Sequence, residues 1–180
     1  MSNHYFIGEK IPPWIAEEIV QAREETTLRK THKSLPLKED LHITLSFLGA
    51  VVPDALEELI QSLEQIDWAP FSLRTDGLAS FGNERTPRVV FVGVQHKEEL
   101  QALQMEVAKV VSSVLGITDT RAYHPHITIA KKWASRASLG IENFDIEEMS
   151  FQVESFSIFQ INPTKTPRYE DVHLFASRRE

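Results

Sequence analysis

The sequence predicts an α+β fold built from two similar βα lobes. Segments that alternate polar and apolar residues, as strands do, are interleaved with segments whose apolar residues recur at helical spacing. The same order of segments occurs twice within 180 residues. Each half is short for a stable core of its own, so the two halves should pack together. We therefore expect a single bilobal domain over residues 1–180, with approximate lobes 1–86 and 87–180 and strands exchanged between them.

The two halves are related by an internal repeat. "YFIG", which ends at Gly8, matches "VFVG", which ends at Gly93, at an offset of 93 − 8 = 85. "HITL" at His42 matches "HITI" at His126, at an offset of 126 − 42 = 84. A Pro-Arg dipeptide also recurs at an offset of 80, as Pro87-Arg88 and Pro167-Arg168. Chance rarely produces several similar offsets, so we expect a pseudo-twofold that brings the His-Ile-Thr segments face to face across a cleft.

The first half is expected to contain two strands and two helices. A short strand at 4–8 precedes a helix at 12–30, in which Pro13 suits the first turn because its missing N–H has no partner there. A basic loop then leads to a strand at 41–48 and an amphipathic helix at 53–66. The apolar faces of the helices are Trp14, Ile15, Ile19 and Val20 in the first, and Leu56, Leu59, Ile60, Leu63 and Ile66 in the second.

The second half repeats this order with additional strands. Residues 71–82 are expected to form strand, bend and strand, and the β-branched segment 88–94 a buried strand. The helix at 97–116 ends at a glycine, which tolerates the left-handed conformation common there. A strand at 126–130 carries the second His-Ile-Thr. The remaining strands are expected at 149–161 and 169–177, after a loop-rich region at 133–147.

Alternation along a strand gives the histidines and threonines a common face. His42 and Thr44 share one face of the first motif strand, while Ile43, Leu45 and Phe47 share the other. The second motif strand repeats the pattern, with His126 and Thr128 on one face and Ile127 and Ile129 on the other. The apolar faces should form the core, so the polar faces should point to solvent or into a groove.

Two imidazoles suit acid–base chemistry on a phosphodiester. Histidine titrates near neutral pH, so one ring can start neutral and the other charged. One ring can then remove a proton from the attacking nucleophile while the other protonates the leaving oxygen, without a metal ion. The hydroxyls of Thr44 and Thr128 can donate hydrogen bonds to the phosphate oxygens, where negative charge builds in the transition state.

Metal binding is the competing use of these histidines. His124 and His126 lie at i and i+2 on one strand face, which suits two ligands. No third ligand occurs at a corresponding place near His42, however, and Thr44 is a poor zinc ligand. We therefore expect no metal site and assign His124 to the wall of the cleft or to a substrate contact. Pro125 lacks a backbone donor, which favours an edge or an irregularity at this end of the strand.

Composition limits the classes of partner. Hydrophobic residues make up 42% and charged residues 25%, which fits a globular protein with a normal core. No apolar run approaches the ~20 residues of a membrane span, and no secretory signal is visible at the N-terminus. The absence of cysteine fits an intracellular, cytoplasmic protein. A net charge of −7 disfavours binding of long nucleic acid over a broad face, so a polyanion should be met locally in a cleft.

At the level of these motifs, the chain resembles the two-histidine (2H) phosphoesterases. "HITLSFLG" and "HPHITIAK" are similar to their paired H-x-T motifs. The resemblance extends to "YFIGEKIP", "LPLKEDL" and "PRVVFVGV", so it covers nearly the whole chain. Within the superfamily, the sequence most resembles the RNA 2′,3′-cyclic phosphodiesterases, also called 2′-5′ RNA ligases.

The resemblance implies a LigT-like fold, in which antiparallel sheets of two βα lobes form a V-shaped central cleft. It implies metal-independent hydrolysis of an RNA terminal 2′,3′-cyclic phosphate to a 2′-phosphate, with weak 2′-5′ ligation as the related reverse reaction. His42 would be the proton donor and His126 the proton acceptor, although the near symmetry of the site leaves the two roles exchangeable. Thr44 and Thr128 would bind the phosphate. No cofactor is implied, and we expect a monomer whose partner is an RNA 3′ end.

Further substrate contacts are expected from His124, Tyr123, Lys131 and Arg88. Tyr123 and Trp133 flank the second motif and are the aromatic residues best placed to stack on a base. Lys131 stands where the family often has arginine, and lysine loses the bidentate phosphate contact. Because it lies at an odd offset from His126, its side chain should face away from the site unless the strand bends. Two alternatives stay open: a phosphodiesterase for a non-RNA cyclic nucleotide, and a nucleotide or RNA-end binding module without turnover.

Overall fold

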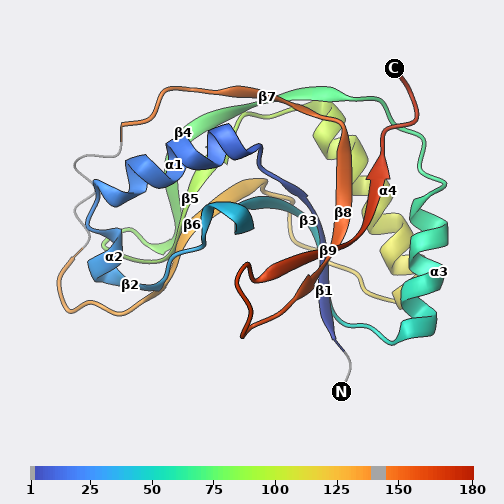
Figure 1. Ribbon diagram of the computed structural model, residues 1–180, viewed down its shortest axis with the longest axis horizontal. Coiled ribbons are helices and arrows are strands. Elements are labelled where there is room, and N and C mark those ends of the chain that lie inside the picture. The colour runs from blue at the N-terminus through green and yellow to red at the C-terminus, as the bar shows by residue number, and fades with distance from the viewer. Residues whose placement is uncertain (1–2, 139–144) are drawn as a thin grey trace.

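Figure 1 shows the computed structural model, which describes residues 3–138 and 145–180. Its strands are β1 (His4–Lys10), β2 (His32–Ser34), β3 (His42–Ala50), β4 (Phe71–Asn83), β5 (Thr86–Val94), β6 (His126–Trp133), β7 (Ser150–Val153), β8 (Ser155–Ile161) and β9 (Tyr169–Ala176). Its helices are α1 (Pro13–Glu24), α2 (Leu28–Thr31), the 3₁₀ turn η1 (Lys38–Asp40), α3 (Pro53–Leu63) and α4 (Glu98–Leu115). The α+β class is thereby confirmed.

The strands of the described residues form one nine-stranded antiparallel sheet that runs through both halves of the chain. The strand order is β7-β4-β5-β6-β3-β1-β8-β9, with β2 paired to β6 (Figure 1). β8 and β9, from the end of the chain, join β1, whereas β4 joins β5. We retain the lobe boundary near residue 86 as a proposal. In that division, β8 of the second lobe pairs with β1 of the first, and β4 of the first lobe pairs with β5 of the second, so strands are exchanged. In the same described residues, no helix is long and apolar enough to cross a membrane.

Three expected elements differ from the structure. The helix expected at 12–30 ends at Glu24, where the Thr26 hydroxyl donates to the carbonyl of Arg23 and accepts the N–H of Leu28, competing with helical bonds. The strand expected at 149–161 is two strands, β7 and β8, which pair with different neighbours. The bend expected within 71–82 is an irregularity inside the continuous strand β4. Part of the loop-rich region expected at 133–147 lies outside the described residues.

The two His-Ile-Thr strands are neighbours in the sheet, and residues of both line one cavity. β3 and β6 are antiparallel, with Ile43 paired to Ile127. This register sets each histidine across from the threonine of the other strand. The two isoleucines are the one backbone pair between the described parts of β3 and β6. We retain the pseudo-twofold between the two halves as a proposal.

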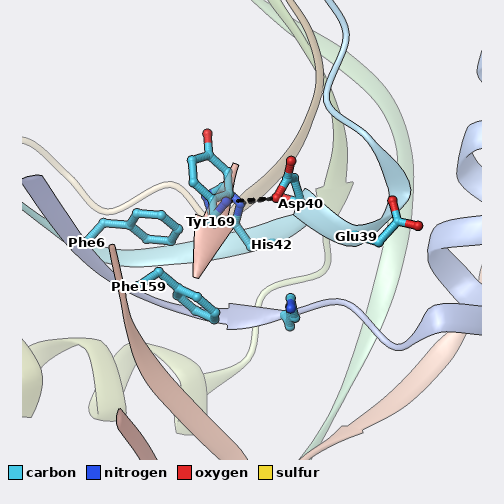
Figure 2. A pocket seen from close by; sticks show the side chains of 7 residues that line it. Phe6, Glu39, Asp40, His42, Phe159 and Tyr169 are labelled. Atoms are coloured by element: carbon cyan, nitrogen blue, oxygen red, sulfur yellow. Dashed lines mark hydrogen bonds between the residues drawn. The ribbon is translucent and has the colours of Figure 1, made fainter. Parts of the chain in front are cut away.

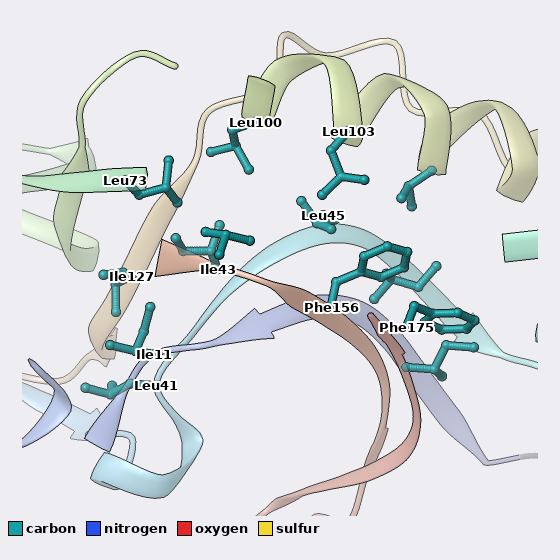
Figure 3. Close-up of a cluster of buried hydrophobic side chains, with 14 of the residues drawn as sticks. Ile11, Leu41, Ile43, Leu45, Leu73, Leu100, Leu103, Ile127, Phe156 and Phe175 are labelled. Atoms are coloured by element: carbon teal, nitrogen blue, oxygen red, sulfur yellow. The ribbon is translucent and has the colours of Figure 1, made fainter. Parts of the chain in front are cut away.

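The core lies on the face of the sheet opposite the histidines. Ile43, Ile127 and Leu45 are buried there; α4 covers Ile43 and Leu45 with Leu100 and Leu103, and Ile127 lies beside Ile11 and Leu41 (Figure 3). These side chains belong to one continuous cluster of buried hydrophobic residues. The motif isoleucines therefore anchor the strands, as the alternating pattern predicts. The face that carries the polar residues is left available for a site.

A β-bulge interrupts the alternation just after the threonine in each motif strand. The β1–β3 register shifts at Leu45, and the β5–β6 register shifts at Ile129. One extra residue moves the following side chains to the other face of the strand. Phe47, expected on the core face, is instead 60% exposed on the face that carries Thr44. The same shift explains why Lys131 is on the polar face.

The structural repeat also differs in register from the sequence repeat. Gly8 pairs with Thr44, whereas Gly93 pairs with His126, so the two glycines are not equivalent. A Cβ on Gly8 would lie 2.6 Å from the carbonyl oxygen of Ile43, so close strand packing requires a glycine there. The Pro-Arg dipeptides are not equivalent either, because Pro87-Arg88 lies in β5 beside β6, and Pro167-Arg168 precedes β9 beside β8.

The bulge on β3 generates a stability prediction for two residues that strict alternation places on the same face. Leu45→Ala should lower the free energy of unfolding by about 2–5 kcal/mol, because Leu45 is 3% exposed. Phe47→Ala, the matched control, should change it by no more than about 0.5 kcal/mol. Urea denaturation measures both values. Equal losses in the two variants would contradict the change of face after the bulge.

Candidate active site

The polar residues of both motifs line one cavity of about 330 Å³. His42, Thr44, His126 and Thr128 all contribute to its wall, as the sequence predicts. Lys131 lines it as well. The antiparallel pairing of β3 with β6 brings these side chains together from positions far apart in the sequence.

His42 is oriented by its own backbone neighbourhood. Its Nδ1 lies 2.8 Å from the carbonyl oxygen of Asp40, the dashed line in Figure 2. A carbonyl can only accept, so Nδ1 carries the proton, and in the neutral ring Nε2 is left as the acceptor. The Thr44 hydroxyl lies 3.0 Å from Nε2 and donates to it. The free protein therefore holds His42 in one tautomer, with Nε2 directed toward its threonine.

Apolar surroundings disfavour the charged form of His42. The ring of Phe6 lies 4.5 Å from the imidazole and that of Tyr169 lies edge-on at 5.1 Å, and Figure 2 shows both rings beside it. Burial lowers the pKa of His42 to about 4. The bond to the Asp40 carbonyl opposes this shift, while the nearby charges of Lys131 and His126 add to it. Protonation of His42 therefore depends on what else occupies the cavity.

His126 has an equivalent arrangement. Its Nδ1 lies 2.7 Å from the carbonyl oxygen of His124, so this ring also presents Nε2. Phe81 and Phe91 pack against it, with ring centroids at 4.9 and 5.1 Å. Burial lowers the pKa of His126, and its bond to the His124 carbonyl opposes the shift. Each motif histidine is thus held by the carbonyl two residues before it, a feature that sequence reasoning missed.

Asp40 is a second feature that sequence reasoning missed. Its side chain is buried, and its carboxylate accepts the backbone N–H of Arg168 at 3.0 Å and that of Tyr169 at 3.1 Å. Its carbonyl holds His42 at the same time. Asp40 therefore fixes the start of β9 relative to the imidazole. The acidic residue in "KEDLHIT" has no counterpart before His126, so the repeat gives no signal for it.

Of the four residues expected to contact substrate, Lys131 alone lines the cavity. Lys131 lines the cavity, and burial together with the charges of Arg168 and Lys132 lowers its pKa. Tyr123 does not line it; its hydroxyl donates to the carbonyl of Thr44 at 2.9 Å and braces β3 from the core side. The side chains of His124 and Arg88 likewise lie outside the lining and are exposed.

The aromatic residues that line the cavity are not those expected from the sequence. Trp133 packs edge-on against His32 and donates to the carbonyl of Ser135, and it is not part of the lining. Phe47 and Phe81 line the cavity instead. Phe47 was missed because its place on the cavity face depends on the bulge, which alternation does not predict. Its exposed ring offers a flat apolar surface beside Thr44.

The described residues contain no group of three or more His, Cys, Asp or Glu side chains that could hold a metal ion. The cavity gathers two imidazoles, two hydroxyls and two cationic side chains, those of Lys131 and Arg168. Imidazoles can exchange protons with a bound group, and hydroxyl and ammonium groups can stabilise negative charge. The arrangement is therefore suited to acid–base chemistry on an anion.

Comparison with known proteins places this geometry in context. A family model described as the 2′-5′ RNA ligase superfamily matches residues 11–163. The RNA 2′,3′-cyclic phosphodiesterase of Bacillus subtilis (strain 168) is 35% identical over 176 residues, which cover 96% of this chain and 95% of that protein. The protein of the same name from Geobacillus stearothermophilus is 30% identical, and the match covers 96% of this chain but 57% of that longer protein.

Solved structures confirm the LigT-like fold. The crystal structure of E. coli LigT complexed with 3′-AMP aligns with a TM-score of 0.83 at 22% identity, covering 99% of this chain and 100% of that one. A crystal structure of a protein from Thermus thermophilus aligns with a TM-score of 0.78 at 23% identity, covering 98% of this chain and 99% of that one.

The apolar surroundings of His42 generate a prediction for its titration. NMR-detected titration of the His42 ring should give a pKa of about 4, because burial penalises the imidazolium. Lys131→Met should raise this pKa, because it removes a nearby positive charge. In the wild-type protein, the His42 ring binds a proton more readily in the unfolded state than in the folded state. The free energy of unfolding should therefore fall as the pH decreases from about 6.5 toward about 4. A pKa at or above 6.5 would contradict the assigned burial.

Proposed function

Because the chain belongs to the 2′-5′ RNA ligase superfamily, we propose that it hydrolyses the terminal 2′,3′-cyclic phosphate of RNA to a 2′-phosphate without a metal ion. The observation that carries the proposal is the pair of imidazoles that present Nε2 from paired strands into one cavity. A phosphate between them can receive a proton on one side and lose one on the other. The protein is thus an RNA 2′,3′-cyclic 3′-phosphodiesterase.

The reaction needs two proton transfers around phosphorus. His126, as acceptor, removes a proton from a water molecule whose oxygen forms the new bond to phosphorus. His42, as donor, protonates the ribose 3′ oxygen as its bond to phosphorus breaks, leaving the phosphate on the 2′ oxygen. Burial opposes protonation of His42 in the free protein. The donor role therefore relies on the bound phosphate, whose negative charge raises the pKa of a neighbouring imidazole.

The threonines and Lys131 stabilise the charge that develops on the phosphate. The Thr44 hydroxyl, which donates to Nε2 of His42 in the free protein, turns toward a non-bridging oxygen when the phosphate arrives. Thr128 takes the equivalent place beside His126. Lys131 adds a positive charge from the same wall, through a single point contact rather than a planar fork.

The substrate is an RNA 3′ end held through a few terminal nucleotides. The exposed ring of Phe47 can stack on the terminal base, since stacking accepts any base. The net charge of −7 disfavours longer contacts along a backbone. One chain supplies both motifs, which supports activity as a monomer. The proposed RNA substrate supports a cytoplasmic location. Weak 2′-5′ joining is the related reverse reaction, with a 5′-hydroxyl in place of water.

Two other functions use the same cavity. A phosphodiesterase for a non-RNA cyclic nucleotide would need the same proton transfers but no contact beyond one nucleotide. A binding module without turnover would retain the cavity and lack the proton transfers, although the retention of both imidazoles with Nε2 directed inward favours catalysis.

The first prediction of this proposal concerns turnover. The protein should hydrolyse nucleoside 2′,3′-cyclic phosphates and a short RNA with a cyclic end, and EDTA should leave the rate unchanged. His42→Ala and His126→Ala should each lower kcat by about 10²–10⁴-fold, as expected for loss of an acid or base. His124→Ala is the matched control and should retain activity, because its ring lies outside the cavity. Product chromatography and circular dichroism measure turnover and folding.

The pH dependence and the negative outcomes complete this test. A plot of kcat/KM against pH should be bell-shaped, with its optimum below pH 6.5, because burial lowers the pKa of both histidines in the free protein. Inhibition by EDTA would exclude the metal-free mechanism. Binding of the cyclic phosphate without turnover would favour the binding module.

The second prediction separates the donor from the acceptor, which the pH profile does not. A substrate with sulfur in place of the bridging 3′ oxygen releases a thiolate, which needs little protonation. His42→Ala should therefore lose much less activity on the sulfur substrate than on the oxygen substrate, whereas His126→Ala should lose equal activity on both. The ratio of the two kcat values for each variant is the measurement. The reverse pattern would exchange the roles of the two histidines.

A further inference from the structure

Arg168 is a cation of the cavity wall that the proposed reaction does not use. It precedes β9 and lines the cavity together with Tyr169, the ring that packs on His42 in Figure 2. Its backbone is fixed on both sides: its N–H donates to the Asp40 carboxylate, and its carbonyl accepts the N–H of Asn162 at 2.7 Å. The Arg168 side chain therefore meets the cavity from an anchored backbone.

The side chain of Arg168 has no protein partner among residues 3–138 and 145–180. No ion pair or side-chain hydrogen bond is recorded for its guanidinium, and its Nε is buried without an acceptor. The Nε of Arg23 is also buried without an acceptor, but the Nη1 of Arg23 bonds to the carbonyls of Pro36 and Ile129, whereas no terminal nitrogen of Arg168 has such a bond in the described residues. A partly buried donor without an acceptor costs free energy, so the unmet acceptor is expected to come from a ligand.

The charge around Arg168 selects an anion as that ligand. Lys131 lines the same cavity, and the positive charge of Arg168 is close enough to lower the pKa of Lys131. An anion bound between or beside two cations that repel each other stabilises the charged form of both. The Asp40 carboxylate offsets part of this positive charge, but it accepts the backbone N–H groups of Arg168 and Tyr169 and forms no ion pair with the Lys131 or Arg168 side chain in the described residues.

The reacting phosphate already has a full set of partners. Two imidazoles, two hydroxyls and Lys131 surround the place where it would lie. The planar fork of arginine suits a phosphate with two free oxygens, which the next phosphate along an RNA chain or a 5′-phosphate provides. Taking the proposed function as its basis, we infer that Arg168 binds a second substrate phosphate, one nucleoside away from the cyclic phosphate. Arg168 then sets a preference for substrates with two phosphates.

Three substrates test this subsite. They are a nucleoside 2′,3′-cyclic phosphate, the same compound with a 5′-phosphate, and a dinucleotide with a cyclic end. Arg168→Gln should lower kcat/KM by about 10- to 100-fold for those substrates whose second phosphate the arginine binds, as expected for loss of a charge-assisted hydrogen bond. It should leave kcat/KM for the single-phosphate substrate within about threefold. A loss on the dinucleotide alone identifies the internucleotide phosphate, and a loss on both identifies any phosphate at the 5′ oxygen.

Two further variants separate recognition from a structural role. Arg168→Lys should recover part of the loss, because it keeps the charge and loses the fork. Lys165→Gln removes one positive charge from the same loop at an exposed position and should leave the preference unchanged. Thermal unfolding of Arg168→Gln should show no loss of stability, since its side chain has no protein partner in the described residues.

The outcomes distinguish this inference from the proposed function. Equal losses on all three substrates would place Arg168 at the reacting phosphate, and no loss on any would exclude a ligand contact; either result overturns the inference. If wild-type protein hydrolyses none of the substrates, the proposed function fails. Calorimetric binding of a nucleoside 2′-phosphate with and without a 5′-phosphate then still tests Arg168, because only the doubly phosphorylated ligand should bind more weakly to Arg168→Gln.

Discussion

The antiparallel pairing of Ile43 with Ile127 is the contact on which the rest of the site depends. Both side chains are fully buried in the core, so neither strand can slip by one residue without exposing its isoleucine. This register sets each histidine across from the threonine of the other strand. The cost of exposing apolar core surface therefore fixes the relative positions of the two histidines and the two threonines.

The bulges convert a symmetric frame into an asymmetric site. Each motif strand carries one extra residue just after its threonine, and each bulge brings a further side chain onto the cavity face. On β3 that side chain is the aromatic Phe47, and on β6 it is the cationic Lys131. Phe47 and Lys131 hold equivalent positions on their strands, three residues after the threonine. Phe47 offers a flat apolar ring and Lys131 a positive charge, which suits a nucleotide with a base at one end and a phosphate at the other.

Local patterns in the sequence predicted the α+β class, the face of each motif residue and the four central side chains, because alternation and burial are encoded residue by residue. The position of Phe47 could not be predicted, since a bulge depends on how two strands fit together. The roles of Asp40 and Arg168 could not be predicted either, because they arise from contacts between segments 128 residues apart in the chain. Tyr123 followed the motif in sequence, yet its hydroxyl binds the back of β3.

Main-chain carbonyls hold the two imidazoles, so the orientation of these rings is robust to mutation of the residues that supply the carbonyls. Substitution at residue 40 or 124 changes a side chain but leaves the carbonyl oxygen in place. The exposed ring of His124 can therefore drift during evolution without disturbing His126. Asp40 is under a separate constraint, because its carboxylate anchors β9. A substitution of Asp40 would therefore leave the bond to His42 in place and release the start of β9.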